Sequence, residues 1–388
     1  MKLLTVGKKV LKTLNEAGYE AYFVGGMVRD QLLGRSIYDV DITTSATPNV
    51  VMSLFEKTIA TGLAHGTVTV MMDQFPVEVT TFRVETGYSD YRHPNEIHFT
   101  SSLAEDLKRR DFTINAIAQD SEGYLHDPMN GLVDLKSRCL KCVGDSTKRF
   151  TEDPLRILRG IRFVSKLGFN LDQKTLEGMK QVNSLIENIS KERVKKELEG
   201  IIQGDFRQDA MSYLYDIGLL NYLPGLSTLA SYQGYNFNLL THPILLFTLA
   251  SLSLEELNSY LMSWPFSREE RKCISVLSQA IANKTPMPYF LYQYKEEWAQ
   301  LYHELICFLN QKQIHYKTYM LPIQSRKDLA INVKTITTLI DRPKGPWIQQ
   351  LVEMIEYEIV MNQLVNEKSA IIEFIKAYEQ GVKDEKKE

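Results

Sequence analysis

The hydrophobic pattern of the first 147 residues alternates between helical and strand periods. An amphipathic run that ends near Gly18 predicts an N-terminal helix. Short β-branched segments follow, each bounded by Gly, Asp or Pro, and "MMDQFP" is placed where a hairpin would turn. These segments are AYFVGG, IYDVDI, GTVTVMM and PVEVTTF. The pattern therefore predicts a domain with a small mixed sheet.

From Thr151 onward the pattern becomes helical almost throughout. Apolar residues recur at near three-residue spacing up to Gly168, which is a candidate helix C-cap. Further helix starts are marked by Ser190, by the capping box from Ser267 to Glu270, and by Pro346. The fold class is thus α+β, with an N-terminal mixed-sheet domain followed by an all-α remainder.

Length, charge and cysteine content narrow the class of protein. A chain of 388 residues is long enough for several hydrophobic cores. Its net charge of −3 argues against coating nucleic acid by overall charge, so an anionic partner must meet a local basic patch. Cys139 and Cys142 form a C-x-x-C in a strand-like segment, where they point to opposite faces and do not share a metal. With no signal-peptide core and no apolar stretch of about 20 residues, we expect a cytoplasmic protein without a membrane span.

Two aspartates, Asp39 and Asp41, are separated by one residue in a segment that reads as a strand. Strand alternation places both carboxylates on one face, where their charges repel unless a divalent cation binds them. Mg²⁺ is commonly held by one or two carboxylates together with substrate phosphates, so the pair is a candidate catalytic and metal site for nucleotidyl transfer. The alternative is a pair of exposed aspartates at a sheet edge.

Upstream of this pair, Gly25 and Gly26 follow an apolar strand and lead into the helical segment MVRDQLLG. The unpaired N–H groups and the dipole of a helix N-terminus suit a triphosphate. Both glycines and Arg29 are therefore candidate nucleotide-binding residues. Two simpler interpretations are an ordinary tight turn at the glycines and a structural ion pair between Arg29 and Asp30.

A charged cluster, DLKRRDFTINAIA at residues 106–118, abuts an apolar segment that reads as a helix start. Arg110, Asp111 and Asn115 are candidates to bracket a ribose and phosphates, because guanidinium groups bind phosphate oxygens in a fork geometry. The alternative is a solvated helix face. Glu78 lies between two valines, and the pattern leaves open whether it is a third metal-site carboxylate or an outward-facing strand residue.

A helix that starts near Thr151 or Asp153 aligns one acid with three arginines. The members of this stripe are Asp153, Arg156, Arg159 and Arg162, at three-residue spacing. We take the stripe as a candidate nucleotide-binding surface. The alternative is a solvated basic helix face on which Asp153 interacts favourably with the helix dipole.

In order and spacing, these motifs resemble those of a known family. GGMVRD with DVD, RRDFTINA, EDPLR and SKERVKKELEGII, within residues 20–205, are similar to class II CCA-adding enzymes, tRNA nucleotidyltransferases of the superfamily that includes DNA polymerase beta. The resemblance implies a catalytic head at 1–147, a base-selecting neck at 148–207, a helical body at 208–305 and a tRNA-binding helical tail at 306–388. It also implies Mg²⁺ at Asp39 and Asp41. The implied reaction adds C, C and A to the tRNA 3′ end from CTP and ATP without a template, and releases pyrophosphate.

The resemblance further implies that Asp153 and Arg156 select the incoming base. Cytosine and adenine each present an exocyclic amine beside a ring-nitrogen acceptor, whereas uracil and guanine present a carbonyl beside a ring N–H. A carboxylate that accepts from the amine, beside an arginine that donates to the ring nitrogen, therefore favours C and A. The segment FRVETGYSDYRHP at residues 82–94 is similar to the flexible element of enzymes that add all three nucleotides.

Alternatives of the same superfamily are a poly(A) polymerase, a partial CC- or A-adding enzyme, and a non-catalytic RNA-binding relative. The intact D-x-D pair argues against a non-catalytic relative, and EDPLR, which carries the base-selecting residues, argues against a poly(A) polymerase. We favour the complete reaction over partial addition because the segment at residues 82–94 is similar to the flexible element, which enzymes that add only CC lack. The expected partners are the tRNA acceptor arm and 3′ end, ATP and CTP. The sequence leaves open whether the chain acts as a monomer or as a homodimer.

Overall fold

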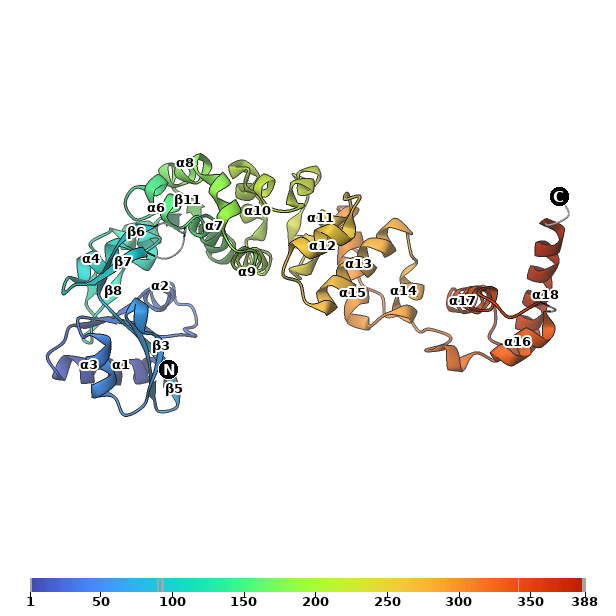
Figure 1. Ribbon diagram of the computed structural model, residues 1–388, viewed down its shortest axis with the longest axis horizontal. Coiled ribbons are helices and arrows are strands. Elements are labelled where there is room, and N and C mark those ends of the chain that lie inside the picture. The colour runs from blue at the N-terminus through green and yellow to red at the C-terminus, as the bar shows by residue number, and fades with distance from the viewer. Residues whose placement is uncertain (1, 89–90, 92–93, 341, 386–388) are drawn as a thin grey trace. The chain divides into compact units, whose positions relative to one another are not determined.

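The structure is a computed structural model that describes residues 2–88, 91, 94–340 and 342–385. The chain forms two compact units, one of Met1–Asn238 with Met262–Pro265 and one of Leu239–Leu261 with Phe266–Glu388. All strands of the described residues belong to the first unit, and the second is built from helices (Figure 1). The predicted α+β class, a mixed-sheet head followed by helices, is confirmed.

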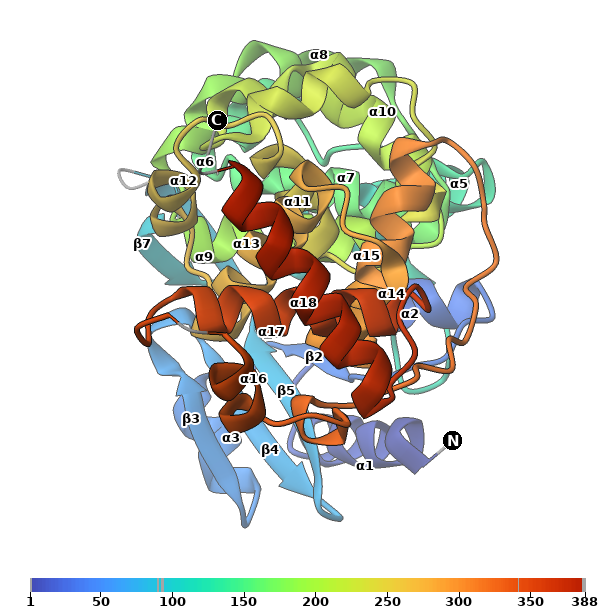
Figure 2. The same ribbon diagram turned by 90° about the vertical axis from the view of Figure 1, so that its right-hand side faces the viewer.

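A seven-stranded mixed sheet runs through the N-terminal part of the first unit, in the order β3-β4-β5-β2-β1-β8-β9. Strands β2 and β5 are parallel, and the other neighbours pair antiparallel. Figure 2 shows β3, β4 and β5 side by side in the blue part of the chain. The strands are β1 (Ala21–Val24), β2 (Asp41–Thr44), β3 (Thr58–Gly62), β4 (Thr67–Met72), β5 (Phe75–Thr81), β8 (Ala118–Gln119) and β9 (Leu125–His126). The predicted hairpin turn falls at Asp73 and Gln74, whose φ angles of 50° and 69° suit a two-residue turn between twisted strands.

One face of the sheet is covered by α1 (Lys2–Glu16) and α3 (Pro48–Leu54) (Figure 1). The apolar stripe of α1 includes Val10 and Leu14, which are buried in the same core as Phe23 of β1. Their four-residue spacing is the helical period that predicted this element. The stripe thus fixes α1 on the sheet.

A separate two-stranded antiparallel sheet follows β5 directly. It pairs β6 (Arg83–Tyr88) with β7 (Pro94–Phe99), and Thr86 lies opposite Glu96. Strand β6 and Pro94, the first residue of β7, belong to the segment 82–94 that was expected to be a flexible element. Four members of that segment, Ser89, Asp90, Arg92 and His93, lie outside the described residues.

Two helices replace the single helix predicted to start near Thr151 or Asp153. Helix α6 (Ser146–Glu152) ends before Asp153, which is extended with φ −144° and ψ 95°, and α7 (Leu155–Leu167) begins after Pro154. The proline explains the break, because it disfavours the helical region for the residue before it. The C-cap at Gly168 is confirmed, with φ 69°.

The first unit also contains shorter elements that connect the sheet to these helices. Its other helices are α2 (Gly26–Leu32), α4 (Leu103–Lys108), α5 (Gly131–Lys136), α8 (Gln173–Gln181), α9 (Lys191–Ile202) and α10 (Arg207–Ile217). Two further strands, β10 (Cys139–Leu140) and β11 (Asn170–Leu171), pair in parallel. Its 3₁₀ turns are η1 (Leu63–His65), η2 (Thr113–Asn115), η3 (Asn183–Asn188), η4 (Leu219–Tyr222) and η5 (Leu226–Tyr232). The turn η6 (Phe237–Leu239) spans the boundary in sequence between the units, and η7 (Arg326–Asp328) belongs to the second unit.

After residue 239 the described chain is helical. The helices are α11 (Ile244–Ser251), α12 (Leu257–Ser263), α13 (Arg268–Ala282), α14 (Met287–Gln293), α15 (Glu296–Leu309), α16 (Val333–Leu339), α17 (Trp347–Val360) and α18 (Lys368–Glu385). The predicted capping box of α13 and the proline at the start of α17 are confirmed. The boundary expected after residue 305 falls inside α15. In the part of the chain that the structure describes, no helix is long and apolar enough to cross a membrane.

Candidate active site

The two aspartates lie at the beginning of β2, near the middle of the large sheet. Asp41 is the first residue of β2 and Asp39 precedes it, so the strand is shorter than predicted. In the parallel pairing of β2 with β5, Asp41 is level with Glu78, which puts their side chains on the same face. Burial and the nearby charges of Asp39 and Glu78 raise the pKa of Asp41 to about 6. Three carboxylates therefore lie close enough to repel one another.

This donor set fits a divalent cation that is shared with a substrate. Among the described residues, no three His, Cys, Asp or Glu side chains form a group that could hold a metal by themselves. Carboxylate oxygens are nevertheless the ligands that hard cations prefer, and a cation would remove the repulsion that raises the pKa of Asp41. The arrangement suits Mg²⁺ whose coordination is completed by phosphate oxygens and water.

The glycine turn before α2 comes close to these carboxylates. Gly25 adopts φ 70° and ψ −137°, a conformation open to glycine but strained for other residues. A Cβ atom at Gly25 would lie 3.3 Å from Arg110 Nη1 and 3.5 Å from Asp41 Oδ2. The turn, Arg110 and Asp41 thus meet at one place, and α2 begins at Gly26 as predicted.

The charged cluster that contains Arg110 is not a solvated helix face. Helix α4 ends at Lys108, and the 3₁₀ turn η2 follows, so the expected apolar helix start is wrong. The reason is tertiary: fully buried Asp106 draws Arg109 and Arg110 inward with ion pairs of 2.8 Å and 3.4 Å. The Nε atom of Arg110 is buried and has no hydrogen-bond partner among the described residues, so this guanidinium keeps donor capacity for a ligand.

Asp106 was missed by the sequence analysis. Its signal is its position three and four residues before Arg109 and Arg110, the spacing at which helical side chains meet. Burial alone would raise the pKa of Asp106, but the two arginines lower it below its usual value. The carboxylate is therefore charged although it has no access to solvent.

Asp111, Asn115 and Arg29 form one hydrogen-bonded chain beside this cluster. Asn115 Nδ2 donates to Asp111 Oδ1 (3.0 Å), and Arg29 Nη1 donates to Asn115 Oδ1 (2.6 Å). Arg159 Nη2 donates to Asp111 Oδ2 (2.6 Å). Burial disfavours the charged form of Asp111, yet Arg159 and Asn115 hold the pKa of that carboxyl well below its usual range. Arg29 also pairs with Asp30 at 2.9 Å, so the structural ion pair considered above is present.

A phenylalanine of α7 organises several of these arginines. The guanidinium carbons of Arg29, Arg159 and Arg162 lie 5.1, 5.9 and 4.9 Å from the ring centroid of Phe163. These distances are within the range of cation–π attraction. Sequence reasoning missed Phe163 because it reads as an ordinary apolar residue of an amphipathic helix.

The three arginines of α7 each pair with an acid, so the solvated-face alternative does not describe them. The pairs are Arg156 with Glu152 (3.3 Å), Arg159 with Asp111 (2.6 Å) and Arg162 with Glu197 (2.5 Å). Arg156 Nη1 also donates to the carbonyl oxygen of residue 149 at 3.2 Å.

Asp153 lies just before α7 rather than on its stripe. Its Oδ1 accepts from the backbone N–H of Leu155 (3.2 Å), and its carboxylate pairs with Arg193 (3.2 Å). The carboxylate thus accepts a hydrogen bond from a free backbone N–H group at the start of α7, and its negative charge interacts favourably with the helix dipole there. Asp153 and Arg156 remain neighbours across the first turn of the helix.

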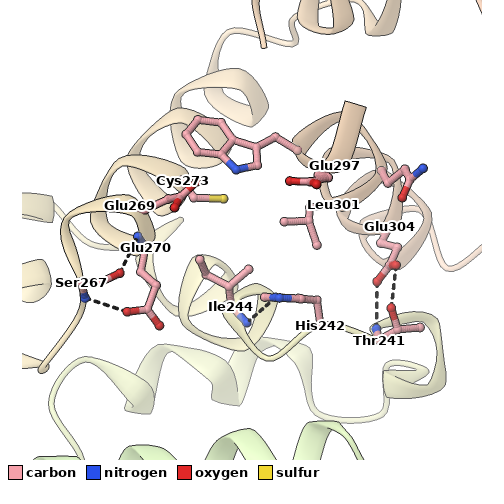
Figure 3. Close-up of a pocket in the computed structure, with 12 residues that line it drawn as sticks. Thr241, His242, Ile244, Ser267, Glu269, Glu270, Cys273, Glu297, Leu301 and Glu304 are labelled. Carbon is pink, nitrogen blue, oxygen red and sulfur yellow. Dashed lines mark hydrogen bonds between the residues drawn. The ribbon is translucent and has the colours of Figure 1, made fainter. Parts of the chain in front are cut away.

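The second unit contains a cavity of about 500 Å³ (Figure 3). Its lining includes Glu269, Glu270, Glu297 and Glu304. Two of these acids have structural tasks: Glu270 completes the capping box with Ser267, and Glu304 accepts from Thr241 (Figure 3). A triphosphate would be repelled by four carboxylates, so this cavity is excluded as the nucleotide site.

Comparison with known proteins accounts for most of the chain. A model of the poly A polymerase head domain matches residues 21–141. A model described as "Probable RNA and SrmB- binding site of polymerase A" matches residues 168–229. A model of tRNA nucleotidyltransferase domain 2 matches residues 243–375.

Several curated relatives match over nearly their full length. A CCA-adding enzyme of Enterococcus faecalis is 36% identical, with 97% of this chain and 98% of the relative covered. A CCA-adding enzyme of Bacillus cytotoxicus is 38% identical, with 96% and 98% covered.

Solved structures of the same kind of protein superpose on this chain. A Bacillus stearothermophilus CCA-adding enzyme in complex with CTP has a TM-score of 0.78 at 32% identity, with 99% of this chain and 100% of that chain covered. A Thermotoga maritima CCA-adding enzyme complexed with tRNA has a TM-score of 0.67 at 19% identity, with 97% and 95% covered, and supports the fold.

Proposed function

The chain belongs to the family of CCA-adding enzymes, the tRNA nucleotidyltransferases, and on this premise we propose which of its residues carry the reaction. The enzyme adds C, C and A to the 3′ end of tRNA from CTP and ATP. The observation that carries the site assignment is the meeting of Asp41, Gly25 and Arg110, with Glu78 level with Asp41 on the next strand. Nucleotidyltransferases of this kind use divalent metal ions, and we assign Mg²⁺ to Asp39 and Asp41, with Glu78 as a third carboxylate.

In each cycle the tRNA 3′-hydroxyl oxygen attacks the α-phosphorus of the nucleotide. The new O3′–Pα bond forms as the bond between Pα and the oxygen that bridges to the β-phosphorus breaks. The hydroxyl proton passes to water, and pyrophosphate leaves. Mg²⁺, when bound, supplies charge stabilisation at the attacking and leaving oxygens. Asp39 and Asp41, at the beginning of β2, would hold the ion.

The triphosphate is assigned to the turn at Gly25 and Gly26 and to Arg110. Gly25 allows the backbone to approach the phosphates closely, because no side chain fills the space beside Asp41. Arg110 offers an Nε–H donor that the described residues leave unused. Asp111 and Asn115 are assigned to the ribose, with Arg29 and Arg159 holding them from either side.

Base selection is assigned to Asp153 and Arg156 at the start of α7. Arg193 and Glu152 contact these two residues from the sides and orient them. Arg162 is assigned a supporting role, because it pairs with Glu197 and stacks near Phe163. A wrong base would leave polar groups unpaired, which costs roughly 1–3 kcal/mol per bidentate contact.

The partners follow from the reaction. The acceptor arm of tRNA is assigned to the helical neck, body and tail, and its 3′ end to the head. Because its substrates are tRNA and nucleoside triphosphates, we place the enzyme in the cytoplasm. Light scattering of the purified protein with and without tRNA distinguishes a monomer from a homodimer.

One assay tests the proposed reaction. A tRNA transcript that lacks its last three nucleotides is incubated with Mg²⁺ and one nucleotide, which is CTP, ATP, UTP or GTP. A further reaction contains CTP and ATP together. The 3′ ends of the products are then sequenced. We expect CC from CTP alone and CCA from the pair. Long A-tails would identify a poly(A) polymerase, and products that stop at CC or gain A only on a CC end would identify a partial enzyme.

A further inference from the structure

Asp106 lies at a junction of three segments of the first unit. Its Oδ1 accepts from Arg109 Nε (2.9 Å) and from the backbone N–H of Arg83 (3.4 Å), the first residue of β6. Its Oδ2 accepts from the hydroxyl of Thr43 (3.1 Å) and pairs with Arg110 Nη2 (3.4 Å). One fully buried carboxylate thus joins β2, the β6–β7 hairpin and the arginine pair.

The hairpin contributes a second carboxylate to this junction. Glu85 of β6 accepts from Arg83 Nε (2.8 Å) and pairs with Arg109 Nη1 (3.3 Å). Its side chain is only 8% exposed. Arg109 is therefore held between Asp106 and Glu85, and it ties the hairpin to the end of α4.

The other side of the junction reaches the reacting groups. Thr43 lies two residues after Asp41 on β2, and Arg110 Nη1 lies beside the glycine turn and Asp41. Arg110 has one ion pair at 3.4 Å and a buried Nε without a partner among the described residues. Asp106 thus supplies the interaction that fixes the direction of Arg110 while the Nε–H group keeps no partner among the described residues.

We propose that Asp106 is a positioning residue that holds Arg110 toward the triphosphate of either nucleotide. In this proposal Glu85 couples the β6–β7 hairpin to Asp106 through their shared partner Arg109. The proposal rests on the proposed function, in which Arg110 binds phosphate. It assigns Asp106 no contact with substrate. It also differs from base selection, because the triphosphate is common to CTP and ATP.

The physical argument is one of charge and alignment. An arginine without a fixed partner retains many rotamers. The entropy cost of fixing its side chain would then weaken the binding of each nucleotide. A charged hydrogen bond that the guanidinium donates to a rigid carboxylate removes that freedom before the nucleotide arrives. Neutral asparagine keeps the shape of Asp106 but presents an amide that cannot balance two guanidinium charges.

The test is steady-state kinetics of CTP and ATP addition by Asp106→Asn in the full chain. We expect the KM for both nucleotides to rise about tenfold, with a smaller change in kcat and an unchanged KM for tRNA. The matched control is Glu105→Gln, which changes a partly exposed acid on the same helix that pairs, within the described residues, with Lys108, and it should match the wild type. If the wild type adds CCA but Asp106→Asn keeps wild-type constants, the positioning role is wrong while the proposed function stands.

A double-mutant cycle separates positioning from general structural damage. In the Arg110→Ala background, Asp106→Asn should cause less than about a twofold further loss in kcat/KM, because its target is already absent. Losses that multiply would overturn the proposal. If Asp106→Asn does not fold well enough to assay, Glu85→Gln takes its place. We expect it to raise the KM for CTP and for ATP about threefold, and no rise would contradict the coupling of Glu85 to Asp106 through Arg109.

Discussion

At the residue scale, the candidate metal ligands contribute charge rather than packing. Asp39 is exposed and Asp41 is partly buried, and neither belongs to a hydrophobic core. Because the pKa of Asp41 is raised to about 6, ionisation of this group is less favourable in the folded protein than in the unfolded chain, although the carboxylate still predominates at pH 7. A bound cation would lower the pKa of Asp41 again, because its positive charge offsets the repulsion between the neighbouring carboxylates.

Replacing either aspartate by asparagine should abolish nucleotide transfer without harming the fold. We expect a loss in activity of at least about a thousandfold for Asp39→Asn and Asp41→Asn, because the charge that holds the metal is gone. Thermal unfolding supplies the second measurement: Mg²⁺ should raise the Tm of the wild type and have much less effect on the variants. Residual activity above a few per cent would place the metal elsewhere.

Gly160 shows how packing can override helix propensity. It lies within α7, where a Cβ atom would approach Met179 Cε to 2.7 Å and Phe112 Cζ to 2.8 Å. Gly160→Ala should gain about 1 kcal/mol of helix propensity but lose about 1–3 kcal/mol to overpacking. We expect net destabilisation in urea unfolding. The matched control is Gly381→Ala in α18, where an added Cβ atom would have no atom of the described residues within 4 Å apart from its own helix backbone, and a neutral or stabilising effect is expected. If both substitutions stabilise the protein, the side chains around residue 160 can move to accommodate the added methyl group, and the expected overpacking is wrong.

At the element scale, the β6–β7 hairpin is separate from the large sheet. Its strands pair with each other, and Gly87 has a φ of 66°. Its contacts through Arg83 and Glu85 lie at the base, close to α4. The distal part can therefore be altered without breaking the pairing of β2 with β5.

Deleting residues 86–93 should separate the C steps from the A step. We expect CTP incorporation within about threefold of the wild type, but ATP incorporation onto a tRNA that ends in CC reduced more than about tenfold, with little change in ATP affinity. The physical reason is that one pocket for two bases needs an element that adjusts it. A glycine–serine replacement of the same length controls for the shortened chain. Equal loss of both activities would mean that the segment supports the fold, and equal retention would exclude it from the switch.

At the scale of the whole molecule, a net charge of −3 must be reconciled with a polyanionic substrate. Attraction to tRNA then depends on local lysines and arginines, and each phosphate contact releases counterions. Specific recognition of RNA also uses shape and the 2′-hydroxyl groups.

The affinity for tRNA should consequently fall steeply with salt. Between 50 and 200 mM salt we expect the Kd to rise at least about tenfold, as measured by fluorescence anisotropy of a labelled tRNA. The Tm of the free protein over the same range controls for changes in stability. A Kd that does not depend on salt would contradict binding through phosphate contacts.

The sequence alone determined the features that depend on neighbours a few residues away. The periodicity of α1, the turn at residues 73 and 74, the cap at Gly168 and the box from Ser267 to Glu270 are all local, so they could be predicted. The family also followed from sequence, because its motifs agree in order and spacing and each motif is short.

Only the tertiary structure decided how side chains that are distant in sequence combine. Asp41 lies level with Glu78 because β2 pairs in parallel with β5, a register that no local pattern encodes. Asp106 reads as a surface acid until burial brings it to Thr43 and the arginine pair. A buried charge must find partners wherever the fold supplies them, and their identity is set by strand order and packing rather than by spacing along the chain.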